Sequence, residues 1–281
     1  MALRFSKMHG LGNDFVVVDC RAQPFGLGAD AIRLLGDRHF GVGFDQLLTI
    51  EPARDPSCAF AYRVWNSDGG ASGQCGNGLR CVTRWLERAG ALVPGPTRLQ
   101  SPSGPVAVEL LSGGRVRADM GEPRFAPADI PLLADAEADA YTIDVAGRGI
   151  VVGAVSMGNP HALVEVDDIA NAPVEALGAQ IEHAAAFPQG CNVGFAEIGS
   201  RGAIRLRVWE RGVGETLACG SGACAAVAGL RRRAKLDAEV CVGLPGGELA
   251  IRWPGSGHGL WMSGPATFVF EGEWSKPPSG G

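Results

Sequence analysis

The chain has 281 residues, of which 46% are hydrophobic and 20% charged, and its net charge at neutral pH is −5. These values are typical of a globular protein that is large enough for one or two domains. Because no stretch of 18 apolar residues occurs, a membrane span is excluded. The only basic run, Arg231-Arg232-Arg233, is expected at a solvated helix end, so we expect no nucleic-acid partner.

Alternating and amphipathic patterns predict a similar series of elements in each half of the chain. In the first half we expect a strand at Phe15–Val18, a helix at about Asp30–Arg38, a strand at 58–65, a helix from about Asn77 and a hairpin at 106–120. In the second half we expect a strand at Ala162–Val166, a helix at Val174–Ala185, a strand at 203–209, a helix from about Ser221 and a hairpin at 247–264. The final residues, EWSKPPSGG, are expected to be disordered.

Three pairs of segments indicate an internal duplication. The segment WNSDGGASGQCGNGLRC at 65–81 corresponds to WERGVGETLACGSGAC at 209–224, with an offset of 144 (219 − 75). GNDFVVVD at 12–19 corresponds to GNPHALVEVD at 158–167, with an offset of 146 (159 − 13), and SPSGPVAVEL at 101–110 corresponds to LPGGELAIRW at 244–253. Because the three pairs keep one order and nearly one offset, the halves are predicted to share one fold.

The predicted fold class is α+β, with two pseudo-symmetric lobes that arose by duplication. We expect an N-terminal lobe of residues 1–119 plus 265–281, to which a C-terminal strand returns, and a C-terminal lobe of residues 120–264. A cleft between two such lobes is a natural place for a ligand.

Cys75 and Cys219 each precede a predicted helix and lie among glycines. The N-terminus of a helix carries a partial positive charge and uncovered N–H groups, so it favours anions. We therefore expect each thiol to have a pKa lowered toward neutrality, and the same N–H groups to bind a ligand carboxylate. Two such thiols on opposite sides of one carbon could remove a proton from one face and return one to the other, which inverts a stereocentre without a cofactor.

Other interpretations of these residues are weaker. The remaining cysteines are expected to be small core residues: Cys20, Cys58, Cys81, Cys191, Cys224 and Cys241. The spacings of the cysteine pairs do not match zinc hooks, and neither glycine-rich segment ends in the Lys-Ser/Thr of a phosphate loop. The three lysines are Lys7, Lys235 and Lys276, none in a context that suggests a pyridoxal phosphate site. We expect no metal and no cofactor.

Several motifs together resemble diaminopimelate epimerases: MHGLGNDF, GFDQLL, CGNGLRC, MGNPH, ERGVGETLACGSGACAA and LPGGELAIRW, in this order over almost the whole chain. The resemblance implies a mixed sheet rolled around a central helix in each lobe. It also implies cofactor-independent, two-base interconversion of LL- and meso-2,6-diaminopimelate, on the route to lysine and peptidoglycan. A homodimer is implied as well.

The resemblance also implies roles for individual residues. Cys75 and Cys219 match the acid/base pair, and His161 and Glu210 match groups that tune the thiol pKa values. The expected substrate contacts are Asn13, Gln46, Asn66, Gly76, Asn77, Asn159, Asn192, Glu210, Arg211, Gly220 and Ser221. Asn side chains suit both an ammonium and a carboxylate, and Arg211 could bind the distal carboxylate in bidentate fashion.

One segment departs from the family pattern. In DGGASGQC, Gly70 and Ala71 stand where a serine and an acidic residue are common, which puts the rigidity of this loop in question.

Two other function classes stay open from the residues alone. The first is a two-cysteine racemase of proline or hydroxyproline, and the second is a thiol-disulfide protein or an inactive binding module. The start of the chain, MALRFSKMHGLGND, lacks the apolar core of a signal peptide, so reduced thiols and a cytoplasmic location are expected.

Overall fold

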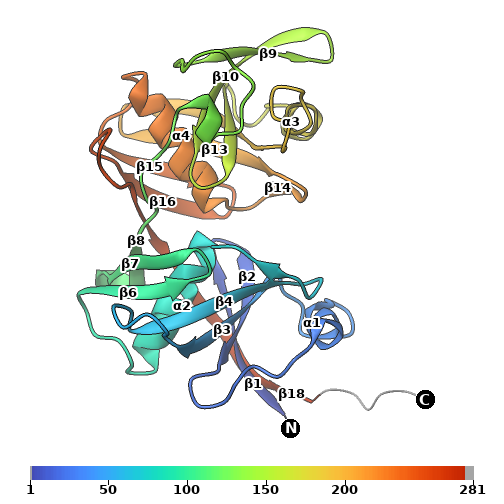
Figure 1. The fold of residues 1–281 in the computed structure, drawn as a ribbon, viewed down its shortest axis with the longest axis vertical. Coiled ribbons are helices and arrows are strands. Elements are labelled where there is room, and N and C mark those ends of the chain that lie inside the picture. The colour runs from blue at the N-terminus through green and yellow to red at the C-terminus, as the bar shows by residue number, and fades with distance from the viewer. Residues whose placement is uncertain (1, 276–281) are drawn as a thin grey trace. The chain divides into compact units, whose positions relative to one another are not determined.

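The computed structural model describes residues 2–275. It divides into two compact units (Figure 1). The residues up to Ala118 and those from Gly264 together form the first unit, and Asp119–Ser263 form the second. In the described residues each unit is a mixed β-sheet with two α-helices and one short 3-10 helix, which confirms the predicted α+β class. Within the described residues, no helix is both long and apolar enough to cross a membrane.

The first unit contains strands β1 (Leu3–Gly10), β2 (Asn13–Asp19), β3 (Gln46–Pro52), β4 (Phe60–Asn66), β5 (Ala71–Ser72), β6 (Pro96–Ser101), β7 (Gly104–Leu110), β8 (Arg115–Asp119) and β18 (Thr267–Trp274), and helices α1 (Ala29–Gly36), α2 (Gly76–Arg88) and η1 (Ser112–Gly114). The second contains β9 (Tyr141–Val145), β10 (Arg148–Ser156), β11 (Pro160–Glu165), β12 (Asn192–Ser200), β13 (Ala203–Glu210), β14 (Gly214–Thr216), β15 (Glu239–Leu244), β16 (Gly247–Arg252) and β17 (Trp261–Pro265), and helices η2 (Pro127–Asp129), α3 (Val174–Glu182) and α4 (Gly220–Arg232).

The two units repeat one strand order. In the first it is β18-β1-β2-β3-β4-β6-β7-β8, and in the second β9-β10-β11-β12-β13-β15-β16-β17, with β5 and β14 added to β4 and β13. The β2–β3 and β4–β6 pairs are parallel, as are β11–β12 and β13–β15. Helices α2 and α4 each contact strands from distant parts of their own sheet, so each sheet curls around one helix.

The registers of the strands repeat as well. Phe15 lies opposite Gln46 in the first unit, and His161 lies opposite Asn192 in the second, 146 positions later in both strands (161 − 15 and 192 − 46). On the other side, β4 and β5 pair in the same register as β13 and β14, at an offset of 144. A one-residue slip would turn every side chain to the opposite face of a sheet. The shared registers therefore give equivalent residues of the two units the same orientation.

The helix starts explain the glycines that follow each cysteine. Cys75 and Cys219 are the N-cap residues of α2 and α4, with φ/ψ of −121°/115° and −111°/108°. A Cβ on Gly78 would lie 3.0 Å from Leu48, and one on Gly222 would lie 3.1 Å from Val208. Glycine at these two positions thus lets the first turn of each helix pack directly on the sheet.

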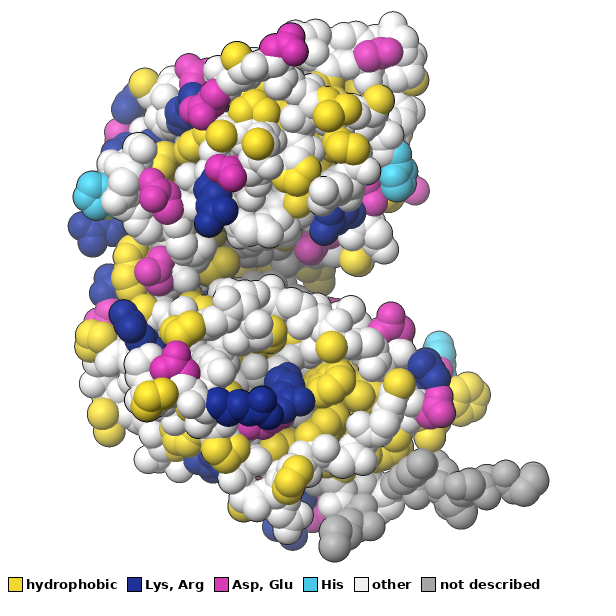
Figure 2. All heavy atoms as spheres, viewed as in Figure 1, with side chains coloured by type: hydrophobic (Ala, Val, Ile, Leu, Met, Phe, Trp, Pro, Cys, Tyr) yellow, Lys and Arg dark blue, Asp and Glu magenta, His cyan; other side chains and the backbone are white. Residues whose placement is uncertain are grey.

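Two expectations about polar segments are corrected in part. The Arg231-Arg232-Arg233 run ends α4 but is half-buried, because Arg232 pairs with Glu137 and Asp139 and Arg233 with Glu165. On the face in Figure 2, Lys and Arg side chains lie interspersed with Asp and Glu in each unit. The C-terminal segment expected to be disordered begins inside β18, which extends to Trp274, while residues 276–281 lie outside the described residues.

The central helix of the first unit provides a test of the core. Leu79 in α2 is completely buried. We expect Leu79→Ala to lower the free energy of unfolding by about 2–5 kcal/mol, since it removes methyl groups and leaves a cavity. Urea unfolding followed by circular dichroism measures this effect. Leu133→Ala, at a residue that is 68% exposed, is the control and should change stability by less than about 0.5 kcal/mol; equal losses would contradict the assigned core.

Candidate active site

Cys75 is held at the start of α2 by contacts on both sides of its sulfur. The backbone N–H of Gly78 donates to Sγ over 3.5 Å, and the thiol lies 3.8 Å from Oδ1 of Asn13 on β2, within reach of a weak S–H donor. The side chain is half-buried. The expected helix-terminal cysteine, its glycines and the first asparagine are therefore together.

The asparagines beside Cys75 belong to a chain of hydrogen bonds that ends on a buried arginine. Asn77 donates from Nδ2 to Oδ1 of Asn13 over 3.2 Å and accepts from Nη2 of Arg80 over 2.9 Å. Arg80 has no exposed surface, and its Nε also donates to the carbonyl of Pro265. We did not single out Arg80 in the sequence. A charged residue three positions after Asn77, on a helix expected to face the core, is the signal that could have identified it.

Gln46 and Asn66 form a second polar pair in the first unit. They lie opposite each other on β3 and β4, and Nε2 of Gln46 donates to Oδ1 of Asn66 over 3.0 Å. The same amide reaches the hydroxyl of Ser72 on β5, at 3.3 Å. These hydrogen bonds join Gln46 and Asn66, two residues expected to bind the substrate, to the loop that leads to Cys75.

In the second unit, Cys219 is 4% exposed and lies at the corresponding helix start. Its sulfur is 3.6 Å from the hydroxyl of Ser221. That hydroxyl accepts from Nδ2 of Asn159 over 3.5 Å, and Oδ1 of Asn159 lies 3.0 Å from Nε2 of His161. Four of the expected site residues therefore form one connected group.

The prediction of a lowered thiol pKa is wrong for Cys219 in this structure. Burial raises its pKa well above the usual range, and the nearby carboxylate of Glu210 raises it further, while the Ser221 hydroxyl opposes both effects. A helix N-terminus stabilises an anion by about 0.3–1 kcal/mol at exposed sites, whereas desolvation of an ion costs several kcal/mol. Desolvation therefore outweighs the helix dipole at this thiol.

Glu210 and His161 differ in how they are held. Glu210 accepts from the hydroxyl of Thr216 over 2.5 Å. His161 is 2% exposed, and burial, followed by the charge of Arg211, lowers its pKa to about 3. The imidazole is thus neutral near pH 7. Because Nε2 faces the carbonyl oxygen of Asn159, that nitrogen carries the proton.

Arg211 lies in a turn that is fixed by an acid which sequence reasoning missed. Its backbone N–H donates to Oδ1 of Asn192 over 3.1 Å, and its guanidinium donates to the carbonyl of Gln189. Glu182, which is 5% exposed, accepts from the Gly212 N–H over 2.8 Å and from the indole of Trp209 over 2.7 Å. A buried carboxylate at the end of an amphipathic helix has no distinct signal in a single sequence.

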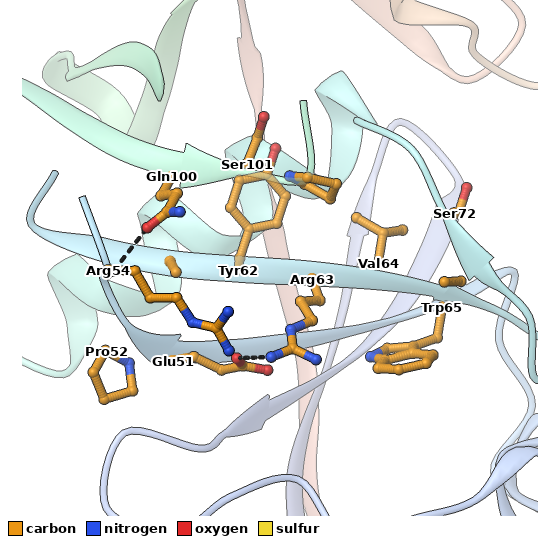
Figure 3. Close-up of a pocket in the computed structure, with 13 residues that line it drawn as sticks. Glu51, Pro52, Arg54, Tyr62, Arg63, Val64, Trp65, Ser72, Gln100 and Ser101 are labelled. Carbon is orange, nitrogen blue, oxygen red and sulfur yellow. Dashed lines mark hydrogen bonds and ion pairs between the residues drawn. The ribbon is translucent and has the colours of Figure 1, made fainter. Parts of the chain in front are cut away.

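A separate cavity of about 350 Å³ opens at β4 in the first unit. Figure 3 shows Tyr62 and Ser101 on one side of the strand, and Arg54, Arg63 and Glu51 on the other. Ser72, the partner of Gln46, also lines this cavity. Neither candidate thiol contributes to it.

The six remaining cysteines were expected in the core, and five are buried: Cys20, Cys58, Cys81, Cys191 and Cys224. Cys241 is half-buried, so the expectation is wrong there. Of the lysines, Lys7 is ion-paired with Asp14 and Lys235 pairs with Glu165, while Lys276 is outside the described residues. Among residues 2–275, no group of three His, Cys, Asp or Glu side chains is arranged to hold a metal ion.

Solved structures with this architecture include racemases and epimerases. A probable proline racemase from Agrobacterium radiobacter has a TM-score of 0.69 at 18% identity, covering 99% of this chain and 94% of that one. A hydroxyproline epimerase from Agrobacterium vitis has a TM-score of 0.70 at 18% identity, covering 97% and 92%. At these identities the likeness shows the fold alone, so the molecule shares the fold of these two proteins.

The sequence relatives are more specific. The diaminopimelate epimerase family profile matches residues 5–126 and 153–269. The chain is 54% identical over 275 residues to the diaminopimelate epimerase of Xanthomonas axonopodis pv. citri, covering 98% of this chain and 97% of that one. It is 51% identical to that of Chromobacterium violaceum, covering 97% and 99%. The chain belongs to the diaminopimelate epimerase family and is an isomerase.

The lowered pKa of His161 predicts how stability depends on pH. The unfolded state binds a proton near pH 6.5, whereas the folded state does so only near pH 3, so stability falls as pH drops through this window. We expect His161→Gln to remove a slope of about 1 kcal/mol per pH unit between pH 6 and pH 4. Urea unfolding at several pH values measures the slope. The control is His39→Gln, at an exposed histidine, which should keep the wild-type slope.

The two thiols are expected to differ in reactivity. Cys219 is buried with a raised pKa, while Cys75 is half-buried. In the ligand-free protein at pH 8, iodoacetamide should therefore modify Cys75 before Cys219, because alkylation requires an accessible thiolate. Peptide mass spectrometry at successive times gives both rates. Faster labelling of Cys219 would contradict the burial assigned to it.

Proposed function

We propose that this chain interconverts LL- and meso-2,6-diaminopimelate, with Cys75 and Cys219 as the acid/base pair. The observation that carries the proposal is the equivalence of the two thiols, since each is the N-cap of the central helix in one of two units with the same strand registers. Family membership and identity above 50% to diaminopimelate epimerases favour this substrate over proline.

In the proposed reaction, one cysteine thiolate removes the α-proton and becomes a thiol. The opposite thiol donates its proton to the other face of the same carbon and becomes a thiolate. The configuration at the α-carbon is inverted, and no electrons are exchanged with an external group. The reverse reaction uses the same two residues in exchanged roles, so no cofactor enters the step.

The α-proton is very weakly acidic, so the developing negative charge has to be stabilised by fixed donors. Backbone groups at the two helix starts, Gly76, Asn77, Gly220 and Ser221, are the proposed donors for the α-carboxylate. The proposed contacts for the rest of the ligand are Asn13, Gln46, Asn66, Asn159, Asn192, Glu210 and Arg211. His161 and Glu210 are proposed to tune the thiols, with the raised pKa of Cys219 as support for Glu210.

For a two-thiol mechanism we expect Cys75→Ala and Cys219→Ala each to reduce epimerisation by about 10²–10⁴-fold or more, because neither thiol alone serves both faces. Conversion of LL- to meso-diaminopimelate measures epimerisation, and exchange of solvent deuterium into the α-carbon, with proline and glutamate as comparison substrates, identifies the substrate. Cys58→Ala should keep wild-type turnover. Circular dichroism is needed for Cys219→Ala in particular, because its side chain is buried.

Wild-type turnover in either variant would overturn the two-thiol mechanism. If deuterium instead entered proline but not diaminopimelate, the substrate would be assigned as proline. A thiol-disulfide function would require that Cys75 and Cys219 cycle between oxidised and reduced forms during turnover, and mass spectrometry of alkylated thiols distinguishes that outcome.

We further propose that the protein acts as a homodimer in the cytoplasm. Both statements are supported by the family resemblance, and light scattering of the purified protein tests the first.

A further inference from the structure

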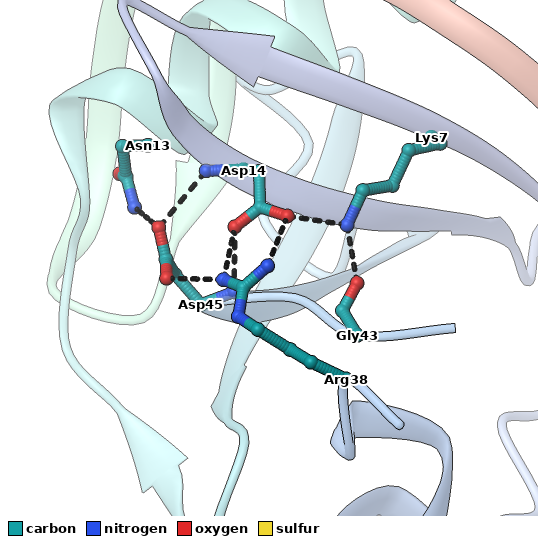
Figure 4. Close-up of polar contacts among 6 residues, drawn as sticks. All are labelled: Lys7, Asn13, Asp14, Arg38, Gly43 and Asp45. Carbon is teal, nitrogen blue, oxygen red and sulfur yellow. Dashed lines mark hydrogen bonds and ion pairs between the residues drawn. The ribbon is translucent and has the colours of Figure 1, made fainter. Parts of the chain in front are cut away.

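The amide of Asn13 has a defined orientation beside Cys75. Its Nδ2 donates to Oδ2 of Asp45 over 2.8 Å, as Figure 4 shows, and its Oδ1 is the end that faces Cys75 and the amide of Asn77. An Asn amide presents two donors at one end and an acceptor at the other. The end that meets the sulfur therefore decides which protonation state of the thiol is favoured.

Asp45 holds the nitrogen end of this amide because an ionised carboxylate only accepts hydrogen bonds, while Nδ2 of Asn77 donates to the oxygen end. The carboxylate is itself fixed, since Oδ2 also accepts from the backbone N–H of Asp14 over 3.0 Å and Oδ1 accepts from Arg38 over 2.8 Å. Asp14 pairs with Arg38 and with Lys7. With an acceptor held at its amide nitrogen, Asn13 has to direct its oxygen toward Cys75.

In the second unit, the amide of the equivalent asparagine has the opposite orientation. Asn159 corresponds to Asn13, but the residue before Asn192 that corresponds to Asp45 is Cys191. There the amide oxygen is taken by His161, and Nδ2 points to the hydroxyl of Ser221. The two helix starts thus receive opposite ends of equivalent amides, and the acid beside Asn13 accounts for the first.

We propose that Asp45 is a positioning residue that holds the carbonyl end of the Asn13 amide against Cys75 and so keeps Cys75 a thiol in the ligand-free protein. The catalytic consequence rests on the proposed function: Cys75 is protonated at rest, and the pH at which it can act as a base follows its pKa. Tyr62 on β4 and Cys81 on α2, both buried, are titratable groups that interact electrostatically with Cys75.

Asp45→Asn tests the proposal directly. The cation of Arg38 and the backbone N–H of Asp14 compete for the one carbonyl oxygen of the introduced amide, so a neutral, weaker partner replaces the carboxylate at Nδ2 of Asn13. The Asn13 amide is then held less firmly, so its carbonyl oxygen stabilises the thiol of Cys75 less. We expect the pKa of Cys75, measured as the pH dependence of its alkylation by iodoacetamide, to fall by about one unit. Asp19→Asn, at a partly exposed ion pair on the same sheet, is the matched control and should leave this pKa unchanged.

Loss of the Asp45 charge alone would also lower the pKa, so the route through Asn13 needs a separate test. In a double-mutant cycle, Asp45→Asn should lower the Cys75 pKa by less in the Asn13→Ala background than in the wild-type background, because only the loss of charge acts there. A shift of equal size in the two backgrounds, or no shift in Asp45→Asn, would overturn the proposal. Asp45→Glu keeps a carboxylate at this position and should have the wild-type Cys75 pKa. If Asp45→Asn does not fold, a changed Cys75 pKa in Asp45→Glu would contradict the role of the carboxylate.

The alkylation readout does not depend on epimerase activity, so it separates this inference from the proposed function. If the chain epimerises diaminopimelate, Asp45→Asn should also move one limb of the pH profile of kcat/KM in the same direction by the same amount. A shift in alkylation with no epimerisation by the wild-type protein would support the positioning role and reject the function. A profile with unmoved limbs in an active enzyme would reject the catalytic part of the inference.

Discussion

The N-cap position of each central helix imposes one constraint on the rest of the site: the thiol that caps the helix is near uncovered N–H groups but also near the core. At Cys219 burial has the larger effect, because desolvation and the charge of Glu210 outweigh the helix dipole and raise the pKa of the thiol. At Cys75 the sulfur keeps partial access to solvent and contacts Gly78 and Asn13. Polar groups around the two cysteines therefore have to set which sulfur is protonated, since the helix dipole alone does not.

The duplication gives both thiols the same backbone position, and substitutions at equivalent positions then make the two environments different. His161 occupies the position of Phe15, and Glu210 and Arg211 occupy those of Asn66 and Ser67, so the ionisable side chains of these pairs are all in the second unit. An epimerase that acts at one end of a molecule with two amino-acid ends needs such a difference.

Spacing and periodicity were sufficient to predict the α+β class, the duplication and the starts of α2 and α4, because each depends on short-range patterns. The environment of Cys219 could not be predicted, since its burial comes from strands far away in the sequence. The same holds for Arg80 and Glu182, whose partners are distant along the chain. A resemblance identifies which residues face a site, but the orientation of an amide such as that of Asn13 depends on a neighbour, Asp45, that motif reading did not single out.

The loop with Gly70 and Ala71 departs from the family pattern, but its backbone conformation does not depend on the side chains at these two positions. Its conformation is held by main-chain contacts: the backbone N–H of Asn66 donates to the carbonyl of Gly70, and β5 pairs with β4 in the same register that β14 keeps with β13. Gly69 adopts a φ of +86°, and a Cβ there would lie 2.6 Å from the carbonyl of Ala29, so glycine is required at that position. Residues 70 and 71 are both exposed, and neither carries a polar side chain that could add to this frame. The backbone of this loop therefore keeps its position without a serine and an acid at these two positions. It continues to place Ser72 next to Gln46 and to lead into Cys75.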